Sequence, residues 1–232
     1  MPHYKIADIV CRFNPRYEET AHWYKPYETD APLDFEREIR ATDEKIEYFV
    51  REGEDITPPL AENMILGALF NIVLLQFNGS YIHSSALLYD DKVYLFSGSS
   101  GVGKSTHTKK WCRLFPDRAQ VINDDKPSFR IIDDKCIVYG TPFAGGTDIH
   151  VNRSAELGAI IFLEQSEENS IELLPPAKAI RYLLEQTPNK RTEKMGERML
   201  SLYSEILTRY PVYKLRCTDS DDAVYEAMKI LE

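Results

Sequence analysis

Hydrophobic and polar residues alternate in much of the first 80 residues, and one strongly apolar stretch follows. Alternating and β-branched residues predict strands over 4–13 and 35–42, with a segment rich in Pro and Tyr between them. The apolar stretch 64–75 covers only 12 residues, whereas a helix that spans a membrane needs about 20. We therefore expect a small β-rich layer and a buried core helix, with no membrane segment.

From residue 81 the pattern changes to short apolar runs separated by turns, and then to helical spacing. Two strands, 81–89 and 92–98, flank the turn Asp90-Asp91, and a helix is expected to begin where the second strand ends. Further strands are predicted at 120–123, 128–132, 136–139, 159–163 and 212–215. Helices are predicted at 176–187, 193–209 and 220–231. This order predicts a mixed α/β fold with a sheet-rich centre.

Composition and charge narrow the class of protein. The chain has 232 residues, of which 43% are hydrophobic and 28% charged, and these proportions are typical of a globular protein. A net charge of −9 argues against a surface that binds nucleic acid. The four cysteines show no metal-binding spacing, and the N-terminus lacks the pattern of a secretory signal. We expect a cytoplasmic protein without a nucleic-acid or membrane partner, and the sequence is compatible with a homo-oligomer.

Residues 98–105, GSSGVGKS, match the phosphate-loop pattern G-x-x-x-x-G-K-[ST] in full. Glycines let the backbone turn so that successive N–H groups face phosphate oxygens, and the N-terminus of the following helix adds partial positive charge. Ordinary residue usage gives a chance match of roughly one percent over this length, and the expected flanking strand and helix lower it further. The predicted nucleotide-binding residues are Gly98, Ser99, Ser100, Gly101, Val102, Gly103, Lys104, Ser105 and Thr106.

Several side chains near this motif have predicted chemical roles. Lys104 would reach the β- and γ-phosphates and Ser105 would ligate Mg²⁺, so ATP and Mg²⁺ are the expected cofactors. The pair Asp124 and Asp125 follows a short apolar run, and one carboxylate would hold Mg²⁺ while the other accepts the proton of an attacking hydroxyl. Glu164 is an alternative acid near the metal, because an apolar strand that ends in an acid is the usual second motif of phosphate-loop NTPases.

Three further basic residues lie near these motifs in the sequence, namely Arg153, His107 and His150. Arg153 would stabilise the charge of the transferred phosphoryl group, because a planar guanidinium binds phosphate oxygens in a bidentate manner. His107 lies in the opening turn of the helix behind the loop, where it can simply pack or cap. His150 shares a loop with Arg153. Neither histidine has a strong claim to a catalytic role.

The motifs between residues 83 and 125 resemble the catalytic core of HPr kinase/phosphorylase and, more distantly, the phosphate-loop region of ATP-dependent phosphoenolpyruvate carboxykinase. The shared features are a strand with a His, GSSGVGKS, a helix, and INDD, in this order. His83 lies 21 residues before Lys104, which is the separation that the family pattern needs. The resemblance therefore lifts His83, which alone would read as a core histidine, to a predicted catalytic residue.

The resemblance also implies roles and a fold. Asp125 corresponds to the base that acts on a serine hydroxyl, and Asp124 to the supporting acid at the metal. The implied fold is a mixed β-sheet with a phosphate-loop core over residues 81–232. Residues 1–80 would form an N-terminal β-rich segment together with the core helix.

The likeness ends beyond the acidic pair. The acidic residue and Arg-Gly-rich loop that follow in the family are not visible, and GTPFAGGTDIHVNR occupies that region. The first 80 residues do not resemble the regulatory domain of the full enzyme. Phosphorolysis is therefore not implied, and the expected acceptor is a serine or threonine of a peptide or protein, or a small hydroxyl compound.

The sequence thus predicts an ATP- and Mg-dependent kinase-like protein with His83, Lys104, Asp125 and Arg153 as catalytic residues. One alternative is an NTP-hydrolysing switch that uses Glu164 at the metal. A second alternative is a nucleotide sensor that binds the triphosphate and has no acceptor. Carboxykinase chemistry would need a dicarboxylate site and a second metal, and the sequence identifies neither.

Overall fold

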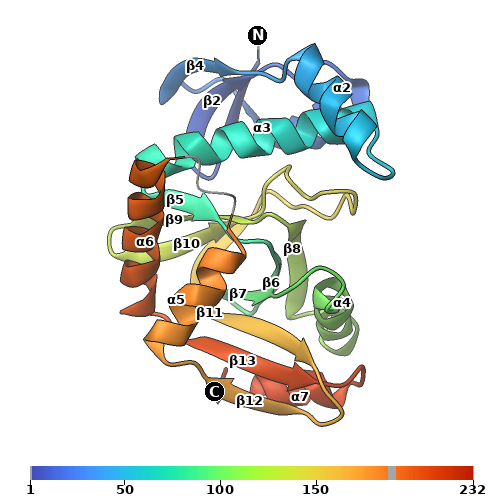
Figure 1. Cartoon of the computed structure of the whole chain (residues 1–232), viewed down its shortest axis with the longest axis vertical. Coiled ribbons are helices and arrows are strands. Elements are labelled where there is room, and N and C mark those ends of the chain that lie inside the picture. The colour runs from blue at the N-terminus through green and yellow to red at the C-terminus, as the bar shows by residue number, and fades with distance from the viewer. Residues whose placement is uncertain (1, 188–191, 232) are drawn as a thin grey trace.

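The computed structural model describes residues 2–187 and 192–231, and they form two β-sheets with helices between and around them (Figure 1). The smaller sheet has four strands in the order β3-β1-β2-β4. The larger sheet has nine strands, seven of them in the order β5-β9-β10-β11-β7-β6-β8, with β13 paired to β11 and β12 paired to β13. The predicted mixed α/β fold is confirmed, and so is the mixed character of the main sheet.

The smaller sheet begins with a hairpin. The single strand predicted over 4–13 is wrong, because β1 (His3–Ile6) and β2 (Ile9–Phe13) are antiparallel and Ile6 pairs with Ile9. Ala7 and Asp8 form the turn with φ angles of 51° and 55°. Two-residue hairpin turns of this kind usually carry Asn-Gly or Asp-Gly, so Ala-Asp gave no turn signal.

The rest of this layer holds two short strands and two helices. The strands are β3 (Glu28–Thr29) and β4 (Phe35–Ile39). The helices α1 (Glu18–Tyr24) and α2 (Asp43–Glu52) were not predicted. Ile46 is the only residue of α2 that is fully buried, so few buried apolar positions mark this helix in the sequence.

Helix α3 (Pro58–Leu74) crosses the molecule between the two sheets (Figure 1). Its buried side chains join one apolar cluster with the small sheet, and Phe70 contacts both Phe13 of that sheet and Phe143 of the loop after β10. Pro58–Phe77, which adds the short 3-10 turn η2 (Leu75–Phe77), is long and apolar enough to cross a membrane, but 61% of its most apolar window is buried inside the protein. The predicted core helix is therefore confirmed, and it starts earlier than expected.

Strand directions in the larger sheet bring the ends of several strands to one edge. Strand β6 (Ser84–Tyr89) is antiparallel to β7 (Lys92–Ser97) and to β8 (Ala119–Asp125), so β7 and β8 run in the same direction. Strand β11 (Ser154–Gln165) is parallel to β7 and to β13 (Val212–Cys217). The carboxyl ends of these four parallel strands and the start of β6 therefore lie at the same edge. We refer to it as the carboxyl edge.

Helices cover both faces of this sheet (Figure 1). On one face, α4 (Lys104–Leu114) and α7 (Asp222–Met228) pack against strand residues such as Phe96. On the other face, α5 (Pro176–Glu185) and α6 (Glu193–Leu207) pack against the neighbouring residue Leu95. The remaining strands are β5 (Gly79–Tyr81), β9 (Ser128–Ile132), β10 (Lys135–Tyr139) and β12 (Ser170–Leu173), and only β12 and β5 lie outside the predicted set.

Gly140 provides a test of this packing. A Cβ at this position would lie 2.0 Å from the carbonyl oxygen of Val151 and 2.5 Å from that of Ile122. Both are backbone atoms of a tightly paired region, where Val151 N donates to Ile122 O at 2.8 Å. Gly140→Ala should lower the free energy of unfolding by about 3 kcal/mol, as strong overpacking does. Urea unfolding measures the change.

Gly146→Ala is the matched control, because nothing lies within 4 Å of a Cβ there. We expect this variant to stay within about 0.5 kcal/mol of the wild type. Equal stability of the two alanine variants would contradict the close approach at Gly140.

Candidate functional site

The glycine-rich loop, residues 98–105, leaves the end of β7 at the carboxyl edge and enters α4. Gly98, Gly101 and Gly103 have φ angles of 142°, 77° and 105°, a region that is strained for residues with a side chain. Nζ of Lys104 donates to the carbonyl oxygens of Gly98 at 3.0 Å and Ser99 at 3.1 Å. Its ammonium thus lies folded over the loop, and burial lowers the pKa of Lys104.

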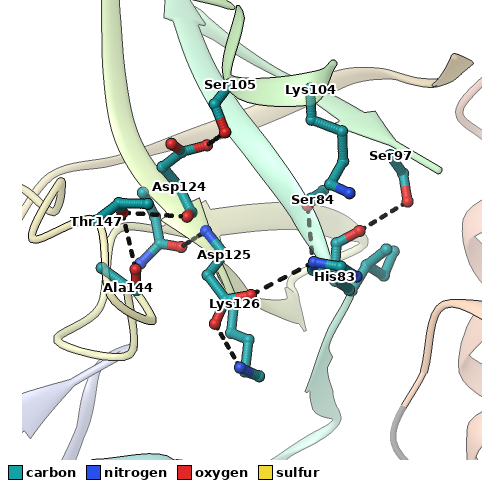
Figure 2. Close-up of polar contacts among 12 residues, drawn as sticks. His83, Ser84, Ser97, Lys104, Ser105, Asp124, Asp125, Lys126, Ala144 and Thr147 are labelled. Atoms are coloured by element: carbon teal, nitrogen blue, oxygen red, sulfur yellow. Dashed lines mark hydrogen bonds and ion pairs between the residues drawn. The ribbon is translucent and has the colours of Figure 1, made fainter. Parts of the chain in front are cut away.

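Ser105 and Asp124 meet at the start of α4. Oγ of Ser105 donates to Oδ1 of Asp124 at 3.0 Å (Figure 2). Asp124 is only 5% exposed, and its Oδ2 is buried without a hydrogen-bond partner. Such an unsatisfied carboxylate oxygen is costly unless a ligand pairs with it. The hydroxyl and the carboxylate are both hard oxygen donors and fit Mg²⁺.

The donor set at this point is small. Among the described residues, no group of three or more His, Cys, Asp and Glu side chains is arranged to hold a metal ion. Mg²⁺ commonly binds through one or two protein oxygens together with phosphate oxygens and water. The residues present therefore fit a Mg²⁺ ion that arrives with a phosphate ligand, and they do not form a closed protein cage.

Asp125 stands beside two groups that can be charged. Nε2 of His83 lies 3.5 Å from Oδ1 of Asp125, and Nζ of Lys126 pairs with Oδ2 (Figure 2). Burial lowers the pKa of His83, and the ammonium groups of Lys104 and Lys126 lower it further, while Asp125 opposes the shift. His83 is therefore neutral at neutral pH.

The backbone around His83 is held on both sides. Its N–H donates to the carbonyl oxygen of Gln186, which directly follows α5, at 3.0 Å. Its carbonyl oxygen accepts from Oγ of Ser97 at 2.8 Å, which ties the start of β6 to the end of β7. The position of His83 relative to Asp125 is thus fixed by two neighbouring strands and a helix.

These side chains line one cavity of about 370 Å³. Its walls include Lys104, Ser105 and both carboxylates, and Leu60 and Met64 of α3 close one side. The loop after β10 closes another side, where a Cβ on Gly145 would lie 2.9 Å from Oδ2 of Asp125. We call this space the acidic-pair cavity, and its residues are His83, Ser84, Ser100, Gly101, Lys104, Ser105, Asp124, Asp125, Lys126, Leu60, Met64 and 144–147.

The structure does not bring Arg153 to this cavity. Arg153 directly precedes β11, whose start lies at the opposite edge of the sheet from the glycine-rich loop. Its side chain is exposed and donates to Oε1 of Gln120, near the start of β8, at 2.7 Å. Residues 149–151 pair with β8, where Asp124 N donates to the carbonyl oxygen of Ile149 at 3.1 Å and Val151 N donates to that of Ile122 at 2.8 Å. The chain therefore runs back along β8, away from Asp125, before it reaches Arg153, and a single sequence carries no signal for this pairing.

Glu164 lies at the carboxyl edge but not beside Ser105. Its carboxylate accepts from Nζ of Lys214 at 2.5 Å and from Nε of Arg216 at 3.1 Å, and these bonds lower the pKa of Glu164. It lines a separate cavity on the α5 side of the loop. Of the two carboxylate positions that the sequence left open for the metal, the structure brings only the acidic pair to Ser105.

The other two candidate histidines, His107 and His150, each pack against aromatic side chains. His107 is 4% exposed, stacks near Phe96 and accepts a hydrogen bond from Nε1 of Trp111 at 3.1 Å. His150 stacks on Tyr27 of the N-terminal layer and lies 3.6 Å from Asp148. Neither side chain lines the acidic-pair cavity.

Sequence reasoning missed Lys126 and the walls of the cavity. Lys126 directly follows the acidic pair, and this adjacency was its only signal. Residues 144–147 lie between the predicted strands 136–139 and 159–163, but their approach to Asp125 depends on tertiary structure. The predicted residues Ser99, Val102, Gly103 and Thr106 line the neighbouring cavities around the same loop.

No protein-family model matches the chain, and no curated protein matches it. Among solved structures, the HPr(Ser) kinase/phosphatase from Coxiella burnetii is similar to it with a TM-score of 0.38 and 18% sequence identity. The alignment covers 66% of this chain and 93% of that chain.

Burial of His107 makes stability depend on pH. Burial, together with the nearby charge of Lys110, lowers the pKa of His107 to about 4. The unfolded chain therefore binds a proton between pH 6.5 and 4 that the folded protein does not bind, so stability falls as pH falls through this window. We expect a loss of about 3 kcal/mol from this group.

The comparison variant is His107→Gln, whose amide oxygen can accept the Trp111 N–H but takes up no proton. Chemical unfolding at several pH values should show a shallower decline for the variant between pH 6.5 and 4. Parallel curves for the two proteins would mean that His107 is not buried as described.

Proposed function

We propose that the protein is a Mg²⁺-dependent phosphotransferase that moves the γ-phosphate of ATP to a hydroxyl group. The observation that carries the proposal is the meeting of Lys104, the Ser105–Asp124 pair and Asp125 around one cavity, at the point where a glycine-rich loop enters a helix. Each of these groups supplies a function that phosphoryl transfer needs: a cation, a metal anchor and a base.

The glycine-rich loop and Lys104 bind the triphosphate. Backbone N–H groups of such a loop and the N-terminus of α4 attract phosphate oxygens. Lys104 now donates to two carbonyl oxygens of its own loop, which are weaker partners than phosphate. Its ammonium exchanges these bonds for the β- and γ-phosphates when the triphosphate binds.

Ser105 and Asp124 hold Mg²⁺. The metal supplies positive charge that neutralises the phosphate oxygens during transfer. The buried Oδ2 of Asp124, which lacks a hydrogen-bond partner, is the protein oxygen with the most to gain from the ion. Ser105 and Asp124 also fix the position of the triphosphate relative to Asp125, the next residue along the chain.

Asp125 accepts the proton of the acceptor hydroxyl. As the hydroxyl oxygen forms its bond to the γ-phosphorus, the bond to the β–γ bridging oxygen breaks, and the proton goes to the Asp125 carboxylate. His83 is neutral, so it orients Asp125 without adding a charge that would compete for the phosphate. Lys126 keeps the carboxylate paired until the substrates enter.

The acceptor enters beside α3. Leu60 and Met64 give part of the cavity wall an apolar character, while Asp124 and Asp125 add carboxylates to it. This space next to Asp125 favours a transferase over a sensor that lacks an acceptor. Glu164 is already held in ion pairs with Lys214 and Arg216. This pairing argues against an NTP-hydrolysing switch in which Glu164 binds the metal. A serine or threonine side chain and a small hydroxyl compound both meet the chemical requirement.

Removal of the base tests the transfer step. Asp125→Asn should bind ATP as the wild type does and lose transfer to an acceptor by a factor of about 10²–10⁴, the usual contribution of a general base. Glu164→Gln is the matched control and should keep full transfer. Single-turnover assays with radiolabelled ATP and a panel of hydroxyl acceptors measure both. Normal transfer by Asp125→Asn would refute the assignment of the base.

Removal of the metal ligand Asp124 should change the Mg²⁺ dependence of ATP binding. Asp124→Asn should raise the Mg²⁺ concentration needed for half-maximal ATP binding at least about tenfold, because a charged metal ligand is lost. Lys104→Ala should abolish ATP turnover at every Mg²⁺ concentration. Titration of Mg²⁺ at fixed ATP distinguishes the two. An unchanged Mg²⁺ dependence in Asp124→Asn would place the metal elsewhere.

A further inference from the structure

A second cavity, of about 450 Å³, lies on the α4 side of the glycine-rich loop. Its walls include Thr106 and Lys110 of α4, Gln165 and Ser166 at the end of β11, and Thr218 and Asp219 after β13. We call it the α4-side cavity. Gly101 is the only residue that it shares with the acidic-pair cavity, so the loop separates the two spaces.

We propose that the α4-side cavity binds the nucleoside of the triphosphate, its base and ribose. This inference rests on the proposed function, because it takes the glycine-rich loop as the phosphate site. It adds where the nucleoside lies and which residues recognise it.

The direction of the triphosphate supports this placement. The γ-phosphate must face Asp125 and the Ser105–Asp124 pair, which lie at the end of β8, on the β6 side of the loop. The nucleoside end then leaves the loop on its other side, where β11 and β13 end. Gln165 and Cys217, the last residues of these two strands, are paired and form the floor of that side. Ligands of sheets of this kind bind beyond the carboxyl ends of parallel strands.

The charged groups differ between this cavity and its neighbour. Within the described residues, a third cavity of about 410 Å³, on the α5 side of the loop, is lined by Glu164 and Glu185 and by no lysine or arginine. The α4-side cavity contains Lys110, which is one turn along α4 from Thr106, on the same face of the helix, and whose ammonium pairs with Asp219 of the same cavity. Of the two cavities, as far as the described residues go, the α4-side cavity is the one with a basic side chain on its wall.

The lining of the α4-side cavity also suits a nucleoside. Oγ1 of Thr218 lies 3.3 Å from Oδ1 of Asn169 and 2.8 Å from Oγ of Ser220, so this hydroxyl is held in place at the rim. The exposed amide of Gln165 offers a donor and an acceptor. Ligand sites of this size typically combine a few fixed polar groups with a concave wall.

The experiment compares ATP with tripolyphosphate, which has the phosphates but no nucleoside. Calorimetry with Mg²⁺ should show that the wild type binds ATP at least about tenfold more tightly than tripolyphosphate, because only ATP fills the α4-side cavity. Ser166→Trp and Thr218→Trp, which fill this cavity, should each weaken ATP about tenfold and leave tripolyphosphate binding unchanged. Tripolyphosphate binding by each variant also shows that its loop is folded.

Glu185→Trp is the matched control, because Glu185 is exposed and lines the α5-side cavity alone. It should bind both ligands as the wild type does. Weaker ATP binding by Glu185→Trp, with normal ATP binding by Ser166→Trp and Thr218→Trp, would overturn the inference and place the nucleoside on the α5 side. Equal affinity of the wild type for ATP and tripolyphosphate would overturn it while the phosphate site stands. Binding of neither ligand would overturn the proposed function as well.

Discussion

The parallel alignment of β7, β8, β11 and β13 is the constraint on which the rest of the site depends. Because β6 is antiparallel to both of its neighbours, β7 and β8 run in the same direction. The glycine-rich loop, the acidic pair and His83 then lie at one edge, although they are far apart in sequence. A slip of one residue between β6 and β8 would turn Asp124 from the buried side to the other face, and Ser105 would lose its partner.

The N-terminal layer is joined to this edge through α3. Glu62 on this helix is fully buried, and its carboxylate accepts from the backbone N–H groups of Arg16 at 3.1 Å and Tyr17 at 3.4 Å. A buried carboxylate without such donors would be strongly unfavourable, so this contact fixes how the first helix of the layer meets α3. Leu60 and Met64 on the same helix line the acidic-pair cavity. The first residues of the chain thereby support the shape of a cavity that lies mainly in the larger sheet.

Much of the fold could be predicted, because hydrophobic periodicity and glycine placement are local signals. The strands around the glycine-rich loop, α5 and α6 are local patterns of this kind, and the structure has them close to their expected bounds. The core helix is another such pattern, although it starts earlier than expected. The hairpin at Ala7-Asp8 could not be predicted, because its positive φ angles come from strand pairing and not from favourable turn residues. The contact between Ser105 and Asp124 followed from motif order, whereas the distance of Arg153 from them depends on the pairing of residues 149–151 with β8. The cavity walls from α3 and the loop 144–147 depend on long-range packing, for which a single sequence holds no signal.

The most direct test of the central claim is a crystal structure of the protein with Mg²⁺ and a non-hydrolysable ATP analogue. We expect Ser105 and Asp124 to contact the metal, Lys104 to have turned from its loop carbonyls to the phosphates, and the γ-phosphate to face Asp125. A nucleotide bound away from the glycine-rich loop, or a metal held by Glu164, would contradict the claim.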